Sequence, residues 1–263
     1  MGKVDYQKSG ATIVITLSRP EKLNALDATM ARALAQAWID FQNDAEATVA
    51  VLTGEGRAFC AGIDVQDRQD RARRGQTGTA LFDHDLPDLY LKTYEQGLPG
   101  VTKPVIVAAN GLTTGIGFHL LIGADLRIAS EDATFGLAEI NIGIVGSNLR
   151  LAAQRLPLAV TMELVLTGDF ISAQRAYEIG LLNSVVPRGD VLNEALAWAD
   201  RLQRHPPKAL EYNKLVTRKA ATSLDGTIDR LLTLYNKELF DSQDHKEAVD
   251  AFLEKRKPHF HGR

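Results

Sequence analysis

VIVAANGLTTGIGFHLLIGADLRIASEDATFGLAEINIGIVG, residues 105–146, is the stretch that decides the fold. It opens on a β-branched apolar run at 105–109, which predicts a buried strand. Glycines at 111, 115 and 117 then lead into a short apolar helix at 116–122, and a second strand follows at 126–129. A strand that turns through glycines into a helix presents free backbone N–H groups at a positive dipole end. We therefore expect this turn to hold a developing negative charge.

Two titratable side chains stand beside that turn. His119 lies within the expected helix, and Glu139 follows the second strand in an apolar, glycine-rich loop. A partly desolvated carboxylate there suits a general acid or base. The structural alternatives are a histidine packed between Phe118 and Leu120, and a glutamate that is exposed or paired with Arg150. The helix dipole would disfavour a charged His119, whereas a nearby Glu139 would favour it.

A second turn of the same kind occurs earlier in the chain, at FCAGID, residues 59–64. It also places a glycine directly after a strand, here one at 49–52. Two such turns, each offering one N–H, are what a two-donor oxyanion hole requires. Cys60 in this turn could be a nucleophile, but a buried free cysteine beside Phe59 usually behaves as a small apolar residue, and we favour that interpretation.

Composition narrows the function classes. The chain has 263 residues, is 45% hydrophobic and carries a formal net charge of −3, with scattered basic residues, so we expect no nucleic-acid partner. No apolar run is long enough for a membrane span, and we expect no membrane association and no signal peptide. The single cysteine excludes an internal disulfide, and a soluble cytoplasmic protein is the simplest expectation. No histidine pair has metal-ligand spacing, and no nucleotide-binding glycine motif is present.

The overall pattern is strand–helix alternation followed by an all-helical end. This predicts the α/β class, with a core at 1–200 and a helical oligomerisation region at 201–263. A strand is expected at 12–18, with a helix after the N-cap Asp27. The helices expected after residue 148 are 148–155, 157–166, 172–180, 189–204, 206–221, 225–241 and 244–256, with a short strand at 183–187. The arginine-rich segment 66–78 predicts a solvated loop, and 81–97 predicts a helix.

The chain resembles the crotonase (enoyl-CoA hydratase/isomerase) superfamily over essentially its whole length. The matching segments are RPEKLNAL at 19–26, FCAGID at 59–64, KPVI at 103–106, AD at 124–125, FGLAE at 135–139, LTG at 166–168, AQRAYEIG at 173–180 and AFLEKR at 251–256. The resemblance implies a crotonase-like spiral of ββα repeats with a C-terminal helical trimerisation region. It also implies a homotrimer or hexamer, an acyl-CoA thioester substrate, and no permanently bound cofactor, since coenzyme A is part of the substrate.

The same resemblance assigns site residues one by one. The backbone N–H groups of Ile63 and Ile116 match the two oxyanion-hole donors. Lys22, Ala61 and Val65 match coenzyme A contacts within the chain.

Other assignments fall near the C-terminus. Phe252 and Lys255 match residues that reach the coenzyme A of a neighbouring subunit. Segment 140–149 is similar to the hydroxycinnamoyl-CoA hydratase-lyase branch, in which Tyr235 matches a tyrosine for a phenolic substrate; a core tyrosine on an apolar helix face is the alternative. The triplet at 83–85 falls where relatives line the acyl pocket, unless it is simply a surface segment.

The acid/base groups depart from the hydratase pattern. Hydratases of this superfamily use two glutamates 20 positions apart; Glu139 matches the second, and His119 stands at the first. A neutral imidazole offers one donor and one acceptor, where a carboxylate only accepts. We therefore expect an acyl-CoA lyase or isomerase with Glu139 as acid/base, with isomerisation, hydration, lyase chemistry and thioester hydrolysis left open. The alternative is a non-catalytic relative that binds a CoA ester or RNA.

Overall fold

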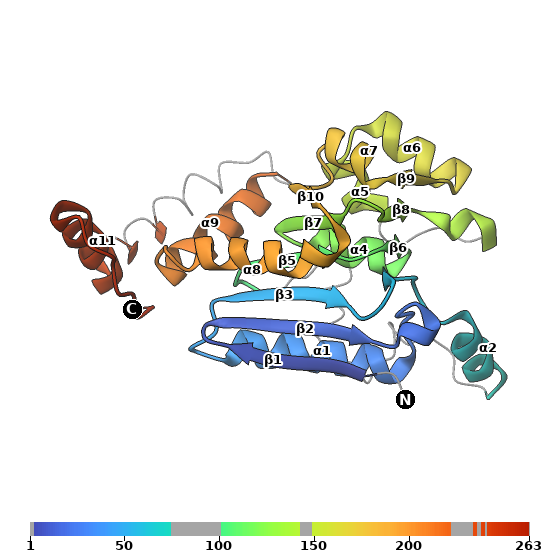
Figure 1. The fold of residues 1–263 in the computed structure, drawn as a ribbon, viewed down its shortest axis with the longest axis horizontal. Coiled ribbons are helices and arrows are strands. Elements are labelled where there is room, and N and C mark those ends of the chain that lie inside the picture. Colours follow the sequence, from blue (N-terminus) through green and yellow to red (C-terminus); the bar gives the residue numbers. More distant parts are fainter. Residues whose placement is uncertain are drawn as a thin grey trace.

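The structure is a computed structural model that describes residues 3–74, 101–142, 149–221, 234–235, 238–239 and 241–262. Its strands form two sheets (Figure 1). The six-stranded sheet has the order β1 (Lys3–Ser9), β2 (Thr12–Ser18), β3 (Val49–Gly54), β5 (Val105–Ala109), β7 (Leu126–Ser130) and β10 (Ser184–Val186). The four-stranded sheet has the order β4 (Ala58–Cys60), β6 (Leu112–Thr114), β8 (Thr134–Gly136) and β9 (Phe170–Ser172).

One pattern recurs along the chain: a strand of the larger sheet, a strand of the smaller sheet, and then a helix. The first repeat is β3, β4 and α2 (Val65–Arg73), and the second is β5, β6 and α4 (Ile116–Gly123). The third is β7 and β8, followed by η2 (Ala138–Ile142) and α5 (Leu149–Arg155). Neighbouring repeats pair in parallel in both sheets. The predicted α/β spiral of ββα repeats is confirmed.

The central strands are apolar throughout because both faces of the larger sheet are covered. Successive side chains of a strand point to opposite faces. Val51 and Ile106 join a core against α8 (Val191–Leu202). Val107 faces the other way, into the main core with α1 (Ala28–Asn43). A strand that is buried on both faces is apolar at every position, as the run at 105–109 is.

Helix α1 begins where the sequence predicted. The Asp27 side chain accepts a hydrogen bond from the Met30 N–H at 2.7 Å, which is an N-cap. The buried face of the helix includes Leu34, Trp38 and Phe41, none more than 1% exposed. The remaining helices among the described residues are η1 (Pro20–Lys22), α6 (Leu158–Thr167), α7 (Ala173–Glu178), η3 (Arg188–Asp190), α9 (Pro207–Ala220) and α11 (Gln243–Glu254).

The prediction of a solvated loop at 66–78 is wrong for its described part, which forms α2. Asp64 starts this helix by accepting hydrogen bonds from the Gln66 and Asp67 N–H groups at 3.0 and 3.2 Å. The helix is polar because it lies at the periphery of the molecule (Figure 1), so no apolar face is required and periodicity could not reveal it. The helix expected at 81–97 and most of that at 225–241 lie outside the described residues.

Candidate active site

The two glycine turns meet. A Cβ atom built on Gly115 would lie 3.3 Å from Gly62 Cα, and one built on Gly62 would lie 3.6 Å from Thr114 O. The two glycines have φ values of +55° and +106°, a region that side chains disfavour. Their backbones are therefore in van der Waals contact, and each glycine is followed directly by one of the two expected donors, Ile63 and Ile116.

The N–H of Ile63 points away from its neighbouring strand. Ile63 forms an isolated parallel bridge with Leu26. Both hydrogen bonds of the bridge use Leu26: its N–H donates to Gly62 O at 2.8 Å, and its carbonyl accepts from the Asp64 N–H at 2.9 Å. The N–H of Ile63 thus faces the opposite side, and no hydrogen bond among the described residues uses it.

Helix α4 begins without a cap. Gly115 stands at its N-cap position and provides no side-chain hydrogen bond. The first bond within the helix runs from the His119 N–H to Gly115 O at 3.1 Å. The N–H groups of the first turn, that of Ile116 among them, therefore have no partner inside the helix. Ile116 is only 6% exposed, so this donor sits at the positive end of the helix dipole and largely away from solvent.

Backbone contact between α4 and β4 fixes the position of that helix end. A Cβ atom on Gly117 would lie 2.3 Å from Cys60 O, so only glycine lets the helix rest directly on the strand. Cys60 is fully buried, and burial raises the pKa of its thiol to about 12. A thiol in that condition is not a nucleophile, and the interpretation of Cys60 as a core residue is confirmed.

The two expected acid/base residues come from adjacent repeats. His119 lies in α4, is 3% exposed, and has both ring nitrogens shielded from solvent. Glu139 is half-buried with Oε2 shielded, and it lies in the 3-10 helix η2, where a loop was expected. Gly136 of β8 pairs with Thr114 of β6. The chain that leads to Glu139 thus leaves the sheet beside the chain that leads to Ile116.

The expected coenzyme A contacts within the chain lie beside the turn at 59–64. Lys22 is exposed at the end of η1. The next residue, Leu23, accepts a hydrogen bond from the Ala61 N–H at 3.0 Å. Val65 begins α2 and is 49% exposed, which is unusual for an apolar side chain beside a buried turn.

The expected C-terminal contacts lie elsewhere in the chain. Tyr235 stacks on Tyr212 of α9, with ring centroids 4.2 Å apart. Lys255 is exposed just beyond α11, which carries Phe252; the side chain of Phe252 lies outside the described residues, as does the triplet at 83–85. Figure 1 places α9 and α11 at the opposite side of the molecule from α2 and α6. A single chain therefore does not bring α9 or α11 to α2, the helix that follows the turn at 59–64.

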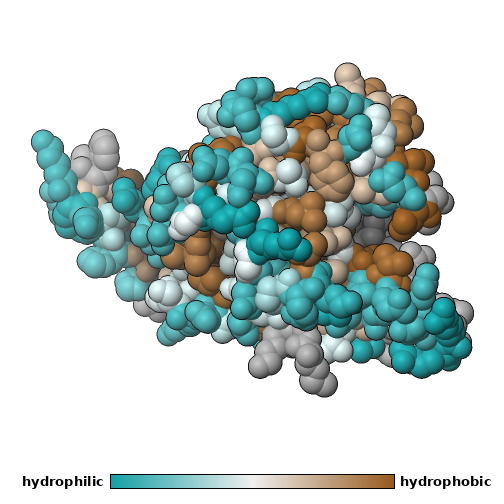
Figure 2. All heavy atoms as spheres, turned by 45° about the vertical axis from the view of Figure 1, so that its right-hand side comes forward, coloured by the Kyte–Doolittle hydropathy of each residue, from teal (hydrophilic) through white to brown (hydrophobic). Residues whose placement is uncertain are grey.

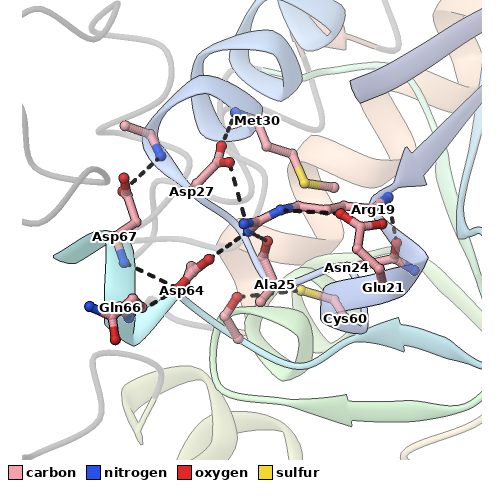
Figure 3. A network of polar contacts seen from close by, with 12 residues as sticks. Arg19, Glu21, Asn24, Ala25, Asp27, Met30, Cys60, Asp64, Gln66 and Asp67 are labelled. Atoms are coloured by element: carbon pink, nitrogen blue, oxygen red, sulfur yellow. Dashed lines mark hydrogen bonds and ion pairs between the residues drawn. The ribbon is translucent and has the colours of Figure 1, made fainter. Parts of the chain in front are cut away.

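A largely buried ion pair beside the turn at 59–64 was not foreseen from the sequence (Figure 3). Arg19 Nη1 lies 2.8 Å from Asp64 Oδ2 and donates to Ala25 O at 3.0 Å. Burial acts to raise the pKa of Asp64, but the Asp67 N–H and the Arg19 guanidinium outweigh it and hold that pKa below its ordinary value. The available signal was that both partners fall within the matching segments 19–26 and 59–64.

At the C-terminal end of α4, two arginine side chains bind the free backbone carbonyls. Arg155 donates to Ile122 O, and Arg218 donates to Gly123 O at 2.6 Å. These are last-turn carbonyls, which have no partner within a helix. Positive side chains are also favoured at this negative end of the dipole.

Asp125 joins the cations at this end. Its carboxylate lies 2.9 Å from Lys214 Nζ and 2.6 Å from Arg218 Nη2, and it accepts from the Val105 N–H at 2.8 Å. Burial lowers the pKa of Lys214 to about 8, although Asp125 opposes that shift. The same cations hold the pKa of Asp125 below its ordinary value against the effect of burial.

Comparison with known proteins identifies the family of this chain. The chain matches the family described as enoyl-CoA hydratase/isomerase over residues 7–263. It belongs to that family. The resemblance to the crotonase superfamily is thereby confirmed, and the chain is, at the level of the family, an enzyme of the enoyl-CoA hydratase/isomerase type.

Relatives of this family align over nearly the full chain. An enoyl-CoA hydratase of Mycobacterium tuberculosis is 33% identical over 98% of this chain and 96% of the relative. A carnitinyl-CoA dehydratase of Proteus mirabilis is 35% identical over 97% of this chain and 96% of the relative. The crystal structure of an enoyl-CoA hydratase from Mycobacterium tuberculosis H37Rv superposes with a TM-score of 0.85, at 33% identity and 99% coverage of both chains.

Two further properties concern the described residues alone. Within them, no three His, Cys, Asp or Glu side chains gather closely enough to hold a metal ion. None of the described helices combines the length and the apolarity that crossing a membrane requires.

Proposed function

We propose that this member of the enoyl-CoA hydratase/isomerase family moves a proton at the carbon next to the carbonyl of an acyl-CoA thioester. Hydration, double-bond isomerisation and hydratase-lyase cleavage share that step. The observation that carries the proposal is the contact between the two glycine turns, because it supports a site that the Ile63 and Ile116 N–H groups share. The names of the relatives, a hydratase and a dehydratase of CoA esters, support the substrate class.

In this proposal the thioester oxygen accepts both N–H groups. Negative charge grows on that oxygen as the neighbouring carbon loses its proton. A fixed donor aimed at such an oxygen in a water-poor site typically contributes about 3–4 kcal/mol to the transition state. Ile116 adds the positive end of α4, and the bridge to Leu26 keeps the Ile63 donor directed away from its own strand.

Glu139 is the proposed acid/base. It is partly shielded from solvent, and its segment leaves the smaller sheet beside the segment that leads to Ile116. A positioned carboxylate that takes and returns a proton contributes on the order of 10²–10⁴-fold to the rate.

His119 takes the place of the first hydratase glutamate. It lies in α4, the helix whose N-terminus carries one oxyanion donor, and it is almost fully buried. In its neutral form an imidazole offers one donor and one acceptor. We propose that His119 holds a water molecule or a substrate hydroxyl, while Glu139 alone transfers the proton.

The proposal extends to a homotrimer or hexamer in which residues 201–263 form the oligomerisation region. Helix α11 projects away from the core in Figure 1, so Phe252 and Lys255 would serve the coenzyme A site of a neighbouring copy. Exposed apolar side chains on one face of α6 support an assembly: Leu158, Met162 and Leu166 are 63%, 45% and 64% exposed. Figure 2 shows apolar atoms gathered on the side of the molecule where Figure 1 draws α6. Analytical ultracentrifugation should give three or six chains, and a monomer would contradict this part.

Turnover and binding of a thioester panel test the proposal. Crotonyl-, 3-enoyl-, feruloyl- and β-ketoacyl-CoA should include at least one substrate, and crotonyl-CoA comes first because the relatives are named as hydratases or dehydratases. Glu139→Gln should retain binding and lose at least about 10²-fold in kcat. Unchanged turnover in that variant would remove Glu139 from the mechanism. Binding without turnover across the panel would favour a non-catalytic relative.

A further inference from the structure

We infer that Arg19 is a positioning residue that aims the Ile63 N–H through Asp64. The inference rests on the proposed function, because it concerns one of the two oxyanion donors. Arg19 and Asp64 have side chains that are 13% and 10% exposed, and their charged atoms are 2.8 Å apart. Asp64 directly follows Ile63, so the ion pair acts one residue away from the proposed donor (Figure 3).

A single guanidinium nitrogen ties together the two segments that form the bridge. Arg19 Nη1 contacts the Asp64 carboxylate and also donates to Ala25 O at 3.0 Å. Ala25 precedes Leu26, the bridge partner of Ile63. The segment that contains Ile63 is therefore held against residues 25–26 by the bridge and by Arg19. This limits rotation of the peptide group that carries the Ile63 N–H.

The second carboxylate oxygen of Asp64 is held as well. Asp64 Oδ1 accepts from the Gln66 and Asp67 N–H groups at the start of α2. Ile63 is thus followed by a residue fixed on one side by a helix start and on the other by Arg19. A donor is aimed reproducibly when the residues around it are locked by their own hydrogen bonds.

Charge gives Arg19 a second effect on the same site. Two other carboxylates face it: Asp27 Oδ2 at 3.7 Å and Glu21 Oε1 at 3.9 Å. Without Arg19, the largely buried carboxylate of Asp64 would keep only its hydrogen bonds from the start of α2 and would lack a charged partner, one residue from the proposed oxyanion donor. That charge would oppose the negative charge that grows on the thioester oxygen.

Spectroscopy on the full-length protein separates positioning from simple structural support. The probe is butanoyl-CoA labelled with carbon-13 at its carbonyl, a saturated ester that cannot be hydrated. Hydrogen bonds to the carbonyl oxygen move its resonance downfield on binding. Arg19→Gln should lose more than half of that displacement. With crotonyl-CoA, or whichever panel member turns over, kcat should fall about 10–100-fold, with KM within about threefold.

Matched variants complete the test. Arg19→Lys keeps the charge and should recover part of both signals. Arg188→Gln breaks an exposed pair with Asp132, whose charged atoms are 2.5 Å apart, and should leave both signals unchanged. Asp64→Asn keeps an oxygen for the start of α2 but loses the ion pair without leaving an opposing negative charge, so it should show the same kind of loss as Arg19→Gln in smaller size. It decides the question if Arg19→Gln does not fold.

The outcomes distinguish the inference from the function on which it rests. No downfield displacement in the unmodified protein would overturn the oxyanion hole itself. A normal displacement there, retained in full by folded Arg19→Gln or Asp64→Asn, would overturn only the positioning role. A raised KM with unchanged kcat would also overturn it, because it would mean that Arg19 supports binding rather than the reaction.

Discussion

The two ends of the eight-residue helix α4 differ in how their backbone groups are satisfied. At the C-terminal end, Arg155 and Arg218 donate hydrogen bonds to the carbonyls of Ile122 and Gly123. The adjoining carboxylate of Asp125 forms ion pairs with Lys214 and Arg218. At the N-terminal end, no side chain of the N-cap residue satisfies the first turn, and Ile116 presents its N–H beside a second glycine turn.

We therefore expect the C-terminal end of α4 to serve stability and the N-terminal end, two helical turns away, to serve function. The C-terminal end is satisfied by the protein itself, so its groups contribute to folding and have nothing left for a ligand. The N-terminal end leaves the Ile116 N–H without a partner inside the helix in a largely buried place, which lowers stability unless a ligand accepts that N–H. Variants at the two ends should therefore divide into those that unfold the chain and those that inactivate it.

Asp125→Asn should have the largest effect, and the effect should be on stability. It leaves Lys214, whose side chain is 6% exposed, and Arg218 without their carboxylate. Removing one partner of a buried ion pair typically costs about 3–5 kcal/mol. Chemical denaturation should show that loss, whereas Asp132→Asn at an exposed pair should cost less than about 1 kcal/mol. Equal small losses in both variants would break the comparison.

Ile116→Pro should have the opposite profile. Proline is tolerated at the first position of a helix because the N–H there has no partner within the helix, so the substitution deletes the proposed donor without breaking α4. We expect kcat to fall about 10²–10³-fold with a modest change in stability. Leu158→Pro at the same position of α6 is the matched control for folding and should leave the helical content measured by circular dichroism unchanged. Full activity in Ile116→Pro would show that this N–H does not act on the substrate.

Gly117→Ala should affect both properties, because it moves the whole helix. The added methyl group would meet Cys60 O at 2.3 Å, and the strain of such overpacking is about 1–3 kcal/mol. The displaced Ile116 donor should also lower kcat. Gly189→Ala is the control, since a Cβ there meets nothing within 4 Å. Unfolding curves and turnover of both variants provide the check, and a Gly117→Ala variant identical to the unmodified protein would contradict the proposed packing.

The smallest effect concerns pH and belongs to the C-terminal end. The pKa of Lys214 is about 8 in the folded chain, whereas the ordinary value of 10.5 applies in the unfolded chain. Above pH 8 the unfolded chain therefore binds more protons than the folded chain. Stability linked to Lys214 should therefore rise with pH in that window, by at most about 1 kcal/mol per unit. Urea denaturation of the unmodified protein and of Lys214→Met at pH 8 and pH 9 should show this rise in the former only.

The parts of the fold that depend on local sequence could be predicted. The apolar run at 105–109, the glycines at 115 and 62, and the cap at Asp27 each have a local physical cause, and each is where the sequence placed it. Helix α2 was missed because a polar peripheral helix leaves no periodic apolar signal.

The polar networks of the site were not predictable. Arg19 and Asp64 are far apart in the sequence, as are Asp125 and its partners on α9. Pairing between such residues is decided by tertiary packing, which neither composition nor periodicity contains. Glycines mark the two turns in the sequence, and the family resemblance names the candidate donors within them. The side chains that hold those turns in place could not be named in either way.

A crystal structure with an unreactive acyl-CoA thioester bound would test the central claim most directly. The account predicts that one carbonyl oxygen lies within about 3.2 Å of both the Ile63 and the Ile116 nitrogen, with Glu139 facing the adjoining carbon. A carbonyl oxygen that contacts neither nitrogen, or two N–H groups that diverge around the bound ester, would contradict it.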